Sequence, residues 1–282
     1  MPELPEVETI RRQIEPRLDG RAVLDAGSHW SAKFTPATAV IGDRLLGAGR
    51  RGKYLLLPTE TGREVVVHLG MTGALRFAPS LGASSPEHGA ALDDPYVRAW
   101  WRLGPGGGSP SGETLLYVDV RRFGRIRVVA AGDYAAIPTL ALAGPEPFDP
   151  AFDGDRFWAL LQQSKRRIKT QLLSQRPVAG VGNIYADEAL WLASINPRVT
   201  RLGRTRAAEL LAALRHVLRQ GIDNGGTTLR DYRTLDGSSG TNQGALSAYG
   251  RAGKPCRRCR TELRAAVIDA RTTTWCPDCQ RR

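Results

Sequence analysis

The four cysteines of this chain constrain its fold more than any other feature. They lie within the last twenty-seven of 282 residues, as the pairs Cys256/Cys259 and Cys276/Cys279, with sixteen residues between the pairs. Two Cys-x-x-Cys pairs at this spacing are typical of a tetrahedral zinc site, in which each pair directs two thiolates at one ion. Four protein ligands leave no open position for a substrate, so the ion is expected to be structural. Two local disulfides, or free thiols, are the alternative.

The charge balance indicates what kind of partner the chain binds. Forty Lys and Arg against twenty-eight Asp and Glu leave a net charge of +12, which favours a polyanion, nucleic acid before others. A basic protein that is merely kept soluble by its charge is the alternative, and the presence of a four-cysteine finger weakens it. No apolar run is long enough to cross a membrane, and the acidic, proline-rich start is unlike a signal peptide. Cysteines kept as thiolates indicate a reducing compartment, the cytoplasm or nucleoid.

The first half of the chain changes from a helical to a β pattern. Apolar residues at helical spacing predict one N-terminal helix that ends near Leu18. From 21 to 135, short apolar runs alternate with glycine, proline and charged turns, a pattern typical of a β-sandwich or barrel. The expected strands cover 54–57, 64–69, 74–77, 97–103, 114–119 and 125–130. Residues 78–95 and 104–113, rich in glycine, proline and serine, are expected to be surface loops.

The second half is predicted to be helical. A proline-rich connector at 136–150 marks the expected domain boundary, and residues 225–249 lack any period and predict a mobile loop. The expected helices cover 156–162, 165–175, 184–193 and 204–224. The predicted organisation is an N-terminal domain at 1–135, the linker at 136–150, a helical domain at 151–249 and the zinc finger at 250–282.

The first residues carry a candidate nucleophile. If Met1 is removed, Pro2 becomes an N-terminal secondary amine, and an α-amine has a pKa of about 8. About a tenth of it is then free base at neutral pH, able to attack an aldehyde-like carbon and form an iminium. Glu3 could move protons for that attack. Proline is common at position two, so a residue without a chemical role is the alternative.

Two further segments could hold phosphate. A glycine-rich turn, 178–182, leads into a helix with Asn183 placed to cap it, and free N–H groups at a helix start bind anions. An ordinary packing turn is the alternative. The cationic run Arg50-Arg51-Gly52-Lys53 enters a strand, and there the alternative for Lys53 is a solvated surface charge.

These segments together resemble one family, the formamidopyrimidine-DNA glycosylases. The resemblance runs in family order over essentially the whole chain and ends with the zinc finger. The matching segments are Met1–Thr9, Arg51–Leu55, His68–Gly73, Arg121–Gly124, the Asn183 turn, Gly225–Leu229 and Tyr249–Arg251.

The resemblance implies a multidomain α+β fold. It comprises an N-terminal helix plus β-sandwich, a helix-two-turn-helix domain with a base-capping loop at 225–249, and a four-cysteine zinc finger, with DNA in the cleft between the domains. The implied activity is that of a bifunctional DNA glycosylase and AP lyase of base excision repair. It excises 8-oxoguanine and formamidopyrimidines through a proline Schiff base, followed by β,δ-elimination. The implied partner is double-stranded DNA with oxidised bases or abasic sites, bound by a monomer, and the only implied cofactor is one structural Zn²⁺.

Four residues take catalytic roles by the resemblance. Pro2 is the nucleophile at the sugar C1′, and Glu3 is its acid/base partner. Lys53 contacts backbone phosphate and is assigned proton donation in β-elimination. Arg271, on the finger hairpin, grips phosphate and is assigned to δ-elimination.

Other residues are implied as DNA contacts. A base in a duplex must be extruded before it can be attacked, and side chains that fill the vacated space recover part of the lost stacking. The resemblance gives that role to Met71, Arg121 and Phe123; without it, Met71 and Phe123 would be assigned to a core. Arg121 is also a donor fork suited to the base left opposite the lesion. The remaining contacts are Glu6 near the sugar, Lys169 and Asn183 around phosphates, and Lys165 and Tyr96.

Four departures from the family pattern stand out. Tyr96 occupies a place where a DNA-contacting histidine is frequent, with His88 upstream, and Asn242 replaces an aromatic residue of the capping loop. Residues 104–113 resemble an insertion, and Arg260 follows Cys259 where glycine is common. The first two bear on the lesion pocket and hence on the substrate range.

Two rival functions remain open. The first is the related endonuclease VIII type, which removes oxidised pyrimidines by the same proline chemistry. The segment Leu4–Glu8 and the pair Arg121 and Phe123 favour the purine enzyme. The second is a non-catalytic zinc-ribbon DNA-binding protein, which would need no Pro2-Glu3 pair.

Overall fold

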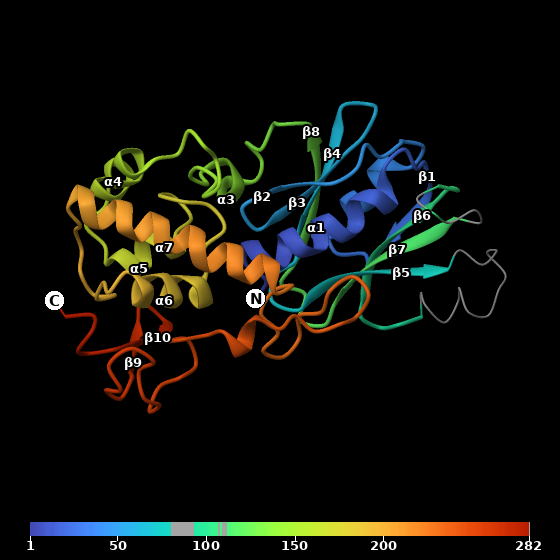
Figure 1. Cartoon of the computed structure of the whole chain (residues 1–282). Coiled ribbons are helices and arrows are strands. Elements are labelled where there is room, and N and C mark those ends of the chain that lie inside the picture. The colour runs from blue at the N-terminus through green and yellow to red at the C-terminus, as the bar shows by residue number, and fades with distance from the viewer. Residues whose placement is uncertain (80–92, 107, 109–111, 282) are drawn as a thin grey trace. The chain divides into compact units, whose positions relative to one another are not determined.

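The chain groups into two compact units. The structure, a computed structural model, describes residues 1–79, 93–106, 108 and 112–281. The first unit comprises Met1–Ala141 with Gly225–Gly240, and the second comprises Leu142–Asn224 with Thr241–Arg282 (Figure 1). His88 and parts of the loops predicted at 78–95 and 104–113 lie outside the described residues. The domain boundaries drawn from the sequence stay a prediction.

The first unit is a helix with two antiparallel sheets, each of four described strands. One sheet has the strand order β1-β6-β7-β5 and the other β2-β3-β4-β8. The helices are α1 (Leu4–Leu18), the 3₁₀ helix η1 (Thr35–Val40) and the short α3 (Pro138–Ala141). The strands are β1 (Val23–Ser28), β2 (Gly49–Arg51), β3 (Tyr54–Pro58), β4 (Arg63–His68), β5 (Gly73–Pro79), β6 (Val97–Leu103), β7 (Glu113–Asp119) and β8 (Arg125–Ala130).

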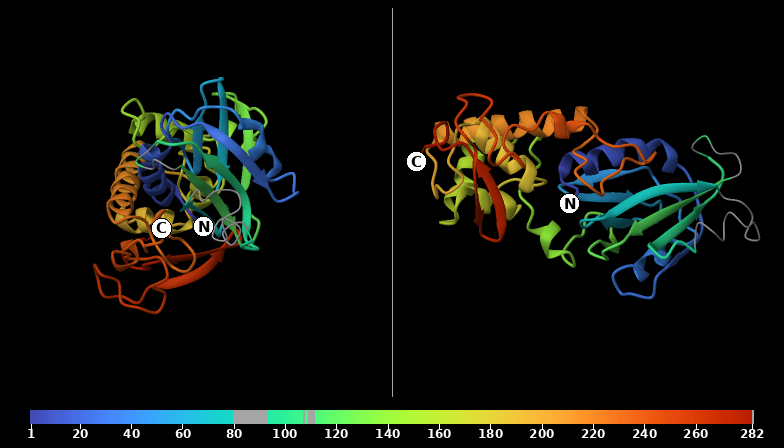
Figure 2. Two further views of the ribbon diagram at one scale, coloured as in Figure 1. Left: turned by 90° about the vertical axis from the view of Figure 1, so that its right-hand side faces the viewer. Right: turned by 90° about the horizontal axis from the view of Figure 1, so that it is seen from below.

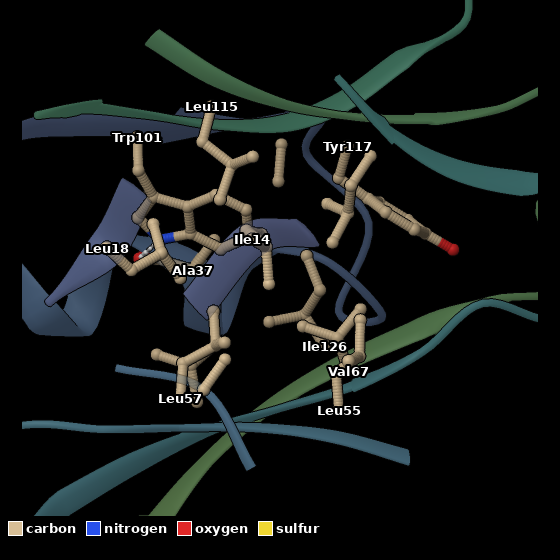
Figure 3. Close-up of a cluster of buried hydrophobic side chains, with 14 of the residues drawn as sticks. Ile14, Leu18, Ala37, Leu55, Leu57, Val67, Trp101, Leu115, Tyr117 and Ile126 are labelled. Atoms are coloured by element: carbon tan, nitrogen blue, oxygen red, sulfur yellow. Dashed lines mark hydrogen bonds between the residues drawn. The ribbon is translucent and has the colours of Figure 1, made fainter. Parts of the chain in front are cut away.

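The core of this unit forms around α1. Its apolar residues recur every three or four positions, so they share one face, which is fully buried. In Figure 3, Ile14 and Leu18 lie between Trp101, Leu115 and Tyr117 of one sheet and Leu55, Leu57, Val67 and Ile126 of the other. The predicted N-terminal helix and β-sandwich are therefore confirmed.

All six predicted strands are present, and two more were missed. Both missed strands, β1 and β2, lie at sheet edges. In β1 only Val23 and Ala26 are buried, and β2 has just three residues. The other two edge strands, β5 and β8, were predicted; β1 and β2 were missed because so few of their residues are buried that no apolar run or alternation shows in the sequence.

The second unit is helical and carries a two-stranded hairpin. Its longest helix, α7, packs along α4 and α6 (Figure 2). A Cβ at Gly221 of α7 would lie 2.5 Å from the Tyr185 hydroxyl of α6, so glycine permits this close approach. The elements are α4 (Gly154–Gln162), α5 (Ile168–Leu173), α6 (Asn183–Leu192), α7 (Arg204–Asp223), the 3₁₀ helix η2 (Asn242–Gly244), β9 (Arg264–Ile268) and β10 (Arg271–Trp275).

The segment predicted as one loop, 225–249, has separate anchors at its two ends. Tyr232 and Leu235 are buried in the first unit's core, and the Leu235 N–H donates to Gln13 Oε1 of α1 at 2.9 Å. In the second unit, Glu188 of α6 accepts the backbone N–H groups of residues 247–249 at 2.8 to 2.9 Å. Such anchors are single contacts between distant segments, which leave no periodic pattern in the sequence. Among the described helices, none is both long and apolar enough to cross a membrane.

Candidate functional site

The start of α1 holds the candidate nucleophile in ordered surroundings. Pro2 is buried, and Glu3 caps the helix in a capping box with Glu6. Glu6 Oε2 accepts the Glu3 N–H at 2.8 Å, and Glu6 Oε1 accepts the Thr227 N–H at 2.7 Å. The buried Glu6 carboxylate therefore joins the N-terminus to the glycine-rich segment at 225–228. Glu6 is expected near the sugar by resemblance; here both of its oxygens receive backbone donors.

Glycine is required where this segment passes Glu6. Gly226 has φ +89°, and a Cβ there would lie 2.7 Å from the Tyr232 ring and 3.1 Å from Glu6 Cγ. Burial, and then the charge of Glu6, raises the pKa of Tyr232, so its hydroxyl stays protonated and donates to Gly225 O at 3.1 Å. The segment is thus held against α1 by both backbone and side-chain contacts.

Lys53 occupies a constrained turn. It follows Gly52, which has φ +55°, between β2 and β3, and its side chain is only 7 % exposed. The hairpin is tied to α1 because Arg50 Nε donates to Glu8 Oε2 at 3.0 Å. Burial opposes ionisation of Glu8, but hydrogen bonds from Arg11, Arg12 and Arg50 outweigh it and lower its pKa. The solvated-charge alternative for Lys53 does not describe this buried position.

His68 is a neighbour of Lys53 to which the sequence assigned no role. It pairs with Tyr54 across β3 and β4, and the two rings lie 4.8 Å apart. Burial, followed by the charges of Lys53 and Arg125, lowers the pKa of His68 to about 4. The neutral ring accepts the Gly70 N–H at Nδ1, 3.1 Å away, so its proton lies on Nε2. Its place in the His68–Gly73 segment was the available signal.

The partly buried His68 should make stability depend on pH. Its pKa is lowered from an ordinary 6.5 to about 4, so between these values the unfolded chain binds the proton more tightly. Stability is therefore full above pH 6.5 and falls as the pH drops towards 4, by about 1 to 3 kcal/mol. Urea unfolding of the wild type and His68→Asn at pH 7.5, 6 and 5 measures this. His68→Asn should lose the His68 contribution, so its stability should fall less on acidification than that of the wild type; Asp187, whose raised pKa acts in the opposite sense, contributes equally to both. His216→Gln, which changes an exposed histidine, should behave like the wild type. Equal slopes in the wild type and His68→Asn would contradict the assignment.

The three predicted space-filling residues all reach the surface of the first unit. Met71 is 40 % and Phe123 50 % exposed, so the core alternative for both is wrong. The Arg121 guanidinium carbon lies 4.9 Å from the Phe123 ring centroid. Their two loops touch, since a Cβ at Gly70 would lie 2.5 Å from Gly124 N. The Tyr96 side chain is also exposed, and its backbone carbonyl accepts the N–H of Asp119, which precedes the loop that carries Arg121 and Phe123.

In the second unit, Arg271 and Lys165 are the accessible cations of the predicted set. Arg271 begins β10 after the tight turn Asp269-Ala270, whose residues both have positive φ, and its side chain is exposed. Lys165 is exposed and lines a shallow pocket of about 530 Å³ with Arg166 and Arg167. Both positions suit contact with an anionic partner.

Lys169 has a structural environment rather than the predicted phosphate contact. It is 1 % exposed; its Nζ lies 2.7 Å from Asp187 Oδ1 and donates to Thr273 Oγ1 at 2.8 Å and to Thr272 O at 3.1 Å. Burial raises the pKa of Asp187 to about 6, and Lys169 and the Thr274 N–H limit the rise. This pair ties α5 and α6 to the finger strand β10. The expectation is corrected because the ammonium is enclosed by protein groups.

Two asparagines make side-chain hydrogen bonds within the second unit. Gly182, and not Asn183, is the N-cap of α6; Asn183 Nδ2 donates to Thr272 O at 3.1 Å. The predicted capping role is therefore wrong, because Asn183 is already the first helical residue. Asn242, expected near the base, is 2 % exposed and accepts the Asn224 side-chain amide at 3.0 Å. In this position it anchors the C-terminal end of α7.

The four cysteines converge on one point. Their sulfur atoms all lie within 4.8 Å of one another, and a tetrahedral zinc with Zn–S bonds of about 2.3 Å places sulfurs about 3.8 Å apart. The sulfurs of Cys259 and Cys276 are 3.4 Å apart, too far for a disulfide, and all four cysteines are free thiols. Burial opposes the thiolate of Cys256, but the N–H groups of Cys259 and Arg258 and the Trp191 indole lower its pKa to about 6. The donor set fits one zinc ion.

The structure shows why glycine is common after Cys259, where this chain has Arg260. Arg260 has φ +69°, the left-handed region that favours glycine. A glycine there would adopt this conformation without strain, whereas arginine bears a small cost that the finger tolerates. Elsewhere in the finger, Cys256, Leu263 and Cys276 form a small core against Trp191.

Comparison with known proteins agrees with this arrangement. Three family models match, namely the formamidopyrimidine-DNA glycosylase N-terminal domain at 1–126, its H2TH domain at 143–233, and the zinc finger found in FPG and IleRS at 253–282. A formamidopyrimidine-DNA glycosylase of Deinococcus radiodurans is 42% identical, over 99% of this chain and 97% of that protein.

Solved structures show the same likeness. The crystal structure of the MutM (Fpg) protein from Thermus thermophilus has a TM-score of 0.86 and 41% identity, covering 99% of this chain and 98% of that one. A Lactococcus lactis FPG mutant in complex with Fapy-dG containing DNA has a TM-score of 0.86 and 32% identity, with both chains covered completely. The chain carries the zinc finger of these proteins, and it belongs to the formamidopyrimidine-DNA glycosylase family.

Proposed function

We propose that this chain is a DNA glycosylase and AP lyase of base excision repair that removes oxidised purines from double-stranded DNA. The observation that supports it most is that one unit carries both sets of residues. Pro2 and Glu3 lie in an ordered helix start, and Met71, Arg121 and Phe123 are exposed on the surface of the same unit. A relative binds Fapy-dG containing DNA and another complex holds an abasic site. We place the reaction in the cytoplasm, carried out by a monomer.

The chemistry follows from an N-terminal amine. Once Met1 is removed, the Pro2 nitrogen lone pair attacks the sugar C1′, the bond from C1′ to the base breaks, and the base leaves with a proton. The Pro2 nitrogen then loses its own proton, and its lone pair expels O4′ of the sugar, which takes up a proton, so the ring opens and an iminium forms at C1′. The iminium acidifies the C2′ hydrogen, so loss of that proton expels the 3′ phosphate, and a second elimination expels the 5′ phosphate. Glu3 moves protons in the attack and ring opening. Zinc takes no part in bond making; it folds the finger that carries Arg271.

Cations hold the phosphates that flank the lesion. Lys53 and the Nε2–H of its neighbour His68 are donors in the first unit, and Arg271 and Lys165 are exposed cations in the second. Each phosphate contact releases a condensed counterion, so affinity should fall steeply with salt. Lys169, enclosed by Asp187 and β10, is assigned to holding the finger instead.

Replacing the phosphate-binding cations should change the salt dependence of binding. Lys53→Ala and Arg271→Ala are each expected to weaken binding to lesion duplex. Each should also flatten the slope of log affinity against log salt by about one unit. Binding measured over a series of salt concentrations tests this, with Arg44→Ala as the control, since Arg44 lies at the far end of β3 from Lys53. Unchanged slopes in both variants would show that neither residue contacts a phosphate.

Substrate choice should favour purine lesions opposite cytosine. Arg121 offers hydrogen-bond donors, and cytosine without its partner offers O2 and N3 as acceptors, whereas adenine offers fewer acceptors and adds a donor. Single-turnover excision of 8-oxoguanine should therefore be faster opposite cytosine than opposite adenine, and formamidopyrimidines should be cut faster than thymine glycol. Faster removal of thymine glycol would place the chain with the endonuclease VIII type. Equal rates opposite both bases would remove Arg121 from this role.

One assay separates enzyme from binding protein. Borohydride added during reaction with 8-oxoguanine duplex should trap a covalent protein–DNA adduct, because it reduces the iminium to a stable amine. A non-catalytic zinc-ribbon protein would bind the duplex without forming any adduct.

A further inference from the structure

A buried carboxylate lies beneath the loop that carries Arg121 and Phe123. Asp119 ends β7, and its side chain is fully buried. Its Oδ1 accepts the Thr72 hydroxyl at 2.6 Å, and its Oδ2 accepts the Gly124 N–H at 2.8 Å and the Tyr117 hydroxyl at 3.4 Å. Burial, followed by the charge of Asp119, raises the pKa of Tyr117, so that hydroxyl remains a donor. One carboxylate thus holds donors from two loops, Thr72 and Gly124, while the single hydroxyl proton of Tyr117 is shared among Oδ2 and the carbonyls of His68 and Leu69, each 3.4 Å away.

The backbone of the same loop is also held at several points. The Asp119 carbonyl accepts Arg98 Nε at 2.8 Å, and the Arg122 carbonyl accepts Lys33 Nζ at 2.9 Å. The Arg121 N–H donates to Thr72 Oγ1 at 3.1 Å. Arg122 has φ +56°, a conformation that a non-glycine residue keeps only where its surroundings impose it. The loop is therefore ordered before any partner binds.

Thr72 links this network to the other space-filling residue. It follows Met71 directly, donates its hydroxyl to Asp119 and accepts the Arg121 N–H. The side chains of Met71 and Phe123 nevertheless remain about half exposed. Asp119 and Thr72 thus fix the backbones of the Met71 loop and of the loop that carries Arg121 and Phe123. The side chains of these three residues stay accessible.

We propose that Asp119, acting through Thr72, is a positioning residue that holds Met71, Arg121 and Phe123 as one preformed wedge for base extrusion. The inference rests on the proposed function. A wedge that is already ordered loses little conformational entropy when it enters the base stack, whereas a loose loop would have to be ordered at the same moment. Asp119 touches no reacting atom in this role.

A positioning role and a merely structural role of Asp119 predict different effects on base excision and on abasic-site cleavage. Excision of 8-oxoguanine from a duplex requires extrusion, but a preformed abasic site has no base to extrude or remove. Loss of the wedge should therefore slow excision far more than abasic-site cleavage. Simple destabilisation of the fold would lower both activities together.

The variants are Asp119→Asn, Thr72→Val and Thr72→Ser, beside a matched control. Asp43 is a buried carboxylate of the same unit that accepts Thr61 Oγ1 at 2.9 Å and Arg63 Nη2 at 2.7 Å. It lies beside the opposite end of β4 from His68, so Asp43→Asn removes a similar buried charge away from the wedge. Thr72→Ser keeps the hydroxyl that Thr72→Val removes.

Single-turnover rates on 8-oxoguanine and abasic duplexes decide the question. Asp119→Asn and Thr72→Val should slow excision about tenfold or more, with abasic cleavage changed about twofold or less, and should reduce the preference for cytosine over adenine. Thr72→Ser should keep the wild-type ratio, and Asp43→Asn should not change it. Amide exchange in 70–73 and 119–124 should quicken in Asp119→Asn and stay unchanged in Asp43→Asn.

Each unfavourable result has a separate meaning. If the wild type cuts abasic sites and lesions but Asp119→Asn keeps the wild-type ratio, the positioning role is overturned and the proposed function stands. If the wild type cuts no lesion, the proposed function fails and the wedge fails with it. If Asp119→Asn does not fold, the comparison of Thr72→Val with Thr72→Ser decides, and equal ratios in that pair overturn the role.

Discussion

Blocking the N-terminal amine is expected to abolish lesion cleavage and borohydride trapping. A chain that retains Met1, or carries an N-terminal tag, has an amide in place of the Pro2 amine. An amide nitrogen has no available lone pair and cannot form the iminium, so the rate should fall by about a thousandfold or more. Binding to lesion duplex should change far less, because the phosphate contacts of Lys53 and Arg271 remain. Gel analysis of trapped adducts and single-turnover cleavage measure both effects.

The matched control is the same protein before and after tag removal. A tag cleaved immediately before Pro2 should restore trapping in the same preparation. Pro2→Gly, which keeps a primary amine, should retain part of the trapping. Full cleavage by a chain with a blocked N-terminus would remove Pro2 as the nucleophile.

Loss of zinc is expected to have the second largest effect. Cys256→Ser removes one of four thiolates, and binding of a structural zinc contributes about 10–16 kcal/mol to the folding of such modules. The finger's own core is small, made of Cys256, Leu263 and Cys276 against Trp191, so it cannot replace that contribution. Metal analysis should show one zinc per chain in the wild type and none in the variant.

DNA binding should be lost together with the metal. Arg271 begins the finger strand β10, which Lys169, Asn183 and Asp187 connect to α5 and α6. Once the finger unfolds, these contacts break and Arg271 loses its fixed position. Val267→Ser, an exposed substitution on β9, should keep both zinc and affinity. A zinc-free preparation that cleaves lesions at the wild-type rate would show that the finger is dispensable.

Much of the fold follows from local patterns in the sequence. The helix from Leu4 to Leu18 and the strands at 97–103 and 125–130 agree with the prediction to within a residue or so. Their apolar positions recur with the period of one element and need only near neighbours to be recognised. β1 and β2 were missed for the opposite reason, since β1 buries only two residues and β2 has only three residues, none of them buried.

For the candidate site too, the sequence indicated some features and missed others. The cysteines, and Pro2 as a candidate, could be named from residue type and immediate spacing, whereas Lys53 and Arg271 were named only through the resemblance to the family. The sequence could not show which of the polar side chains would be buried in the folded protein. Lys169 has the charge of a phosphate ligand, yet Asp187 and β10 enclose it, and Asn242 turns inward to Asn224.

The sequence by itself determined the family, the zinc ligands and the cationic character, since each depends on residues close together along the chain. Only the tertiary structure revealed the partners of Glu6, His68 and Asp119. Thr227 lies 221 positions from Glu6, and Thr72 lies 47 positions from Asp119. A hydrogen bond between such distant residues forms only when folding brings their segments together. The burial that results then decides whether a polar group can bind a ligand or stabilises the fold.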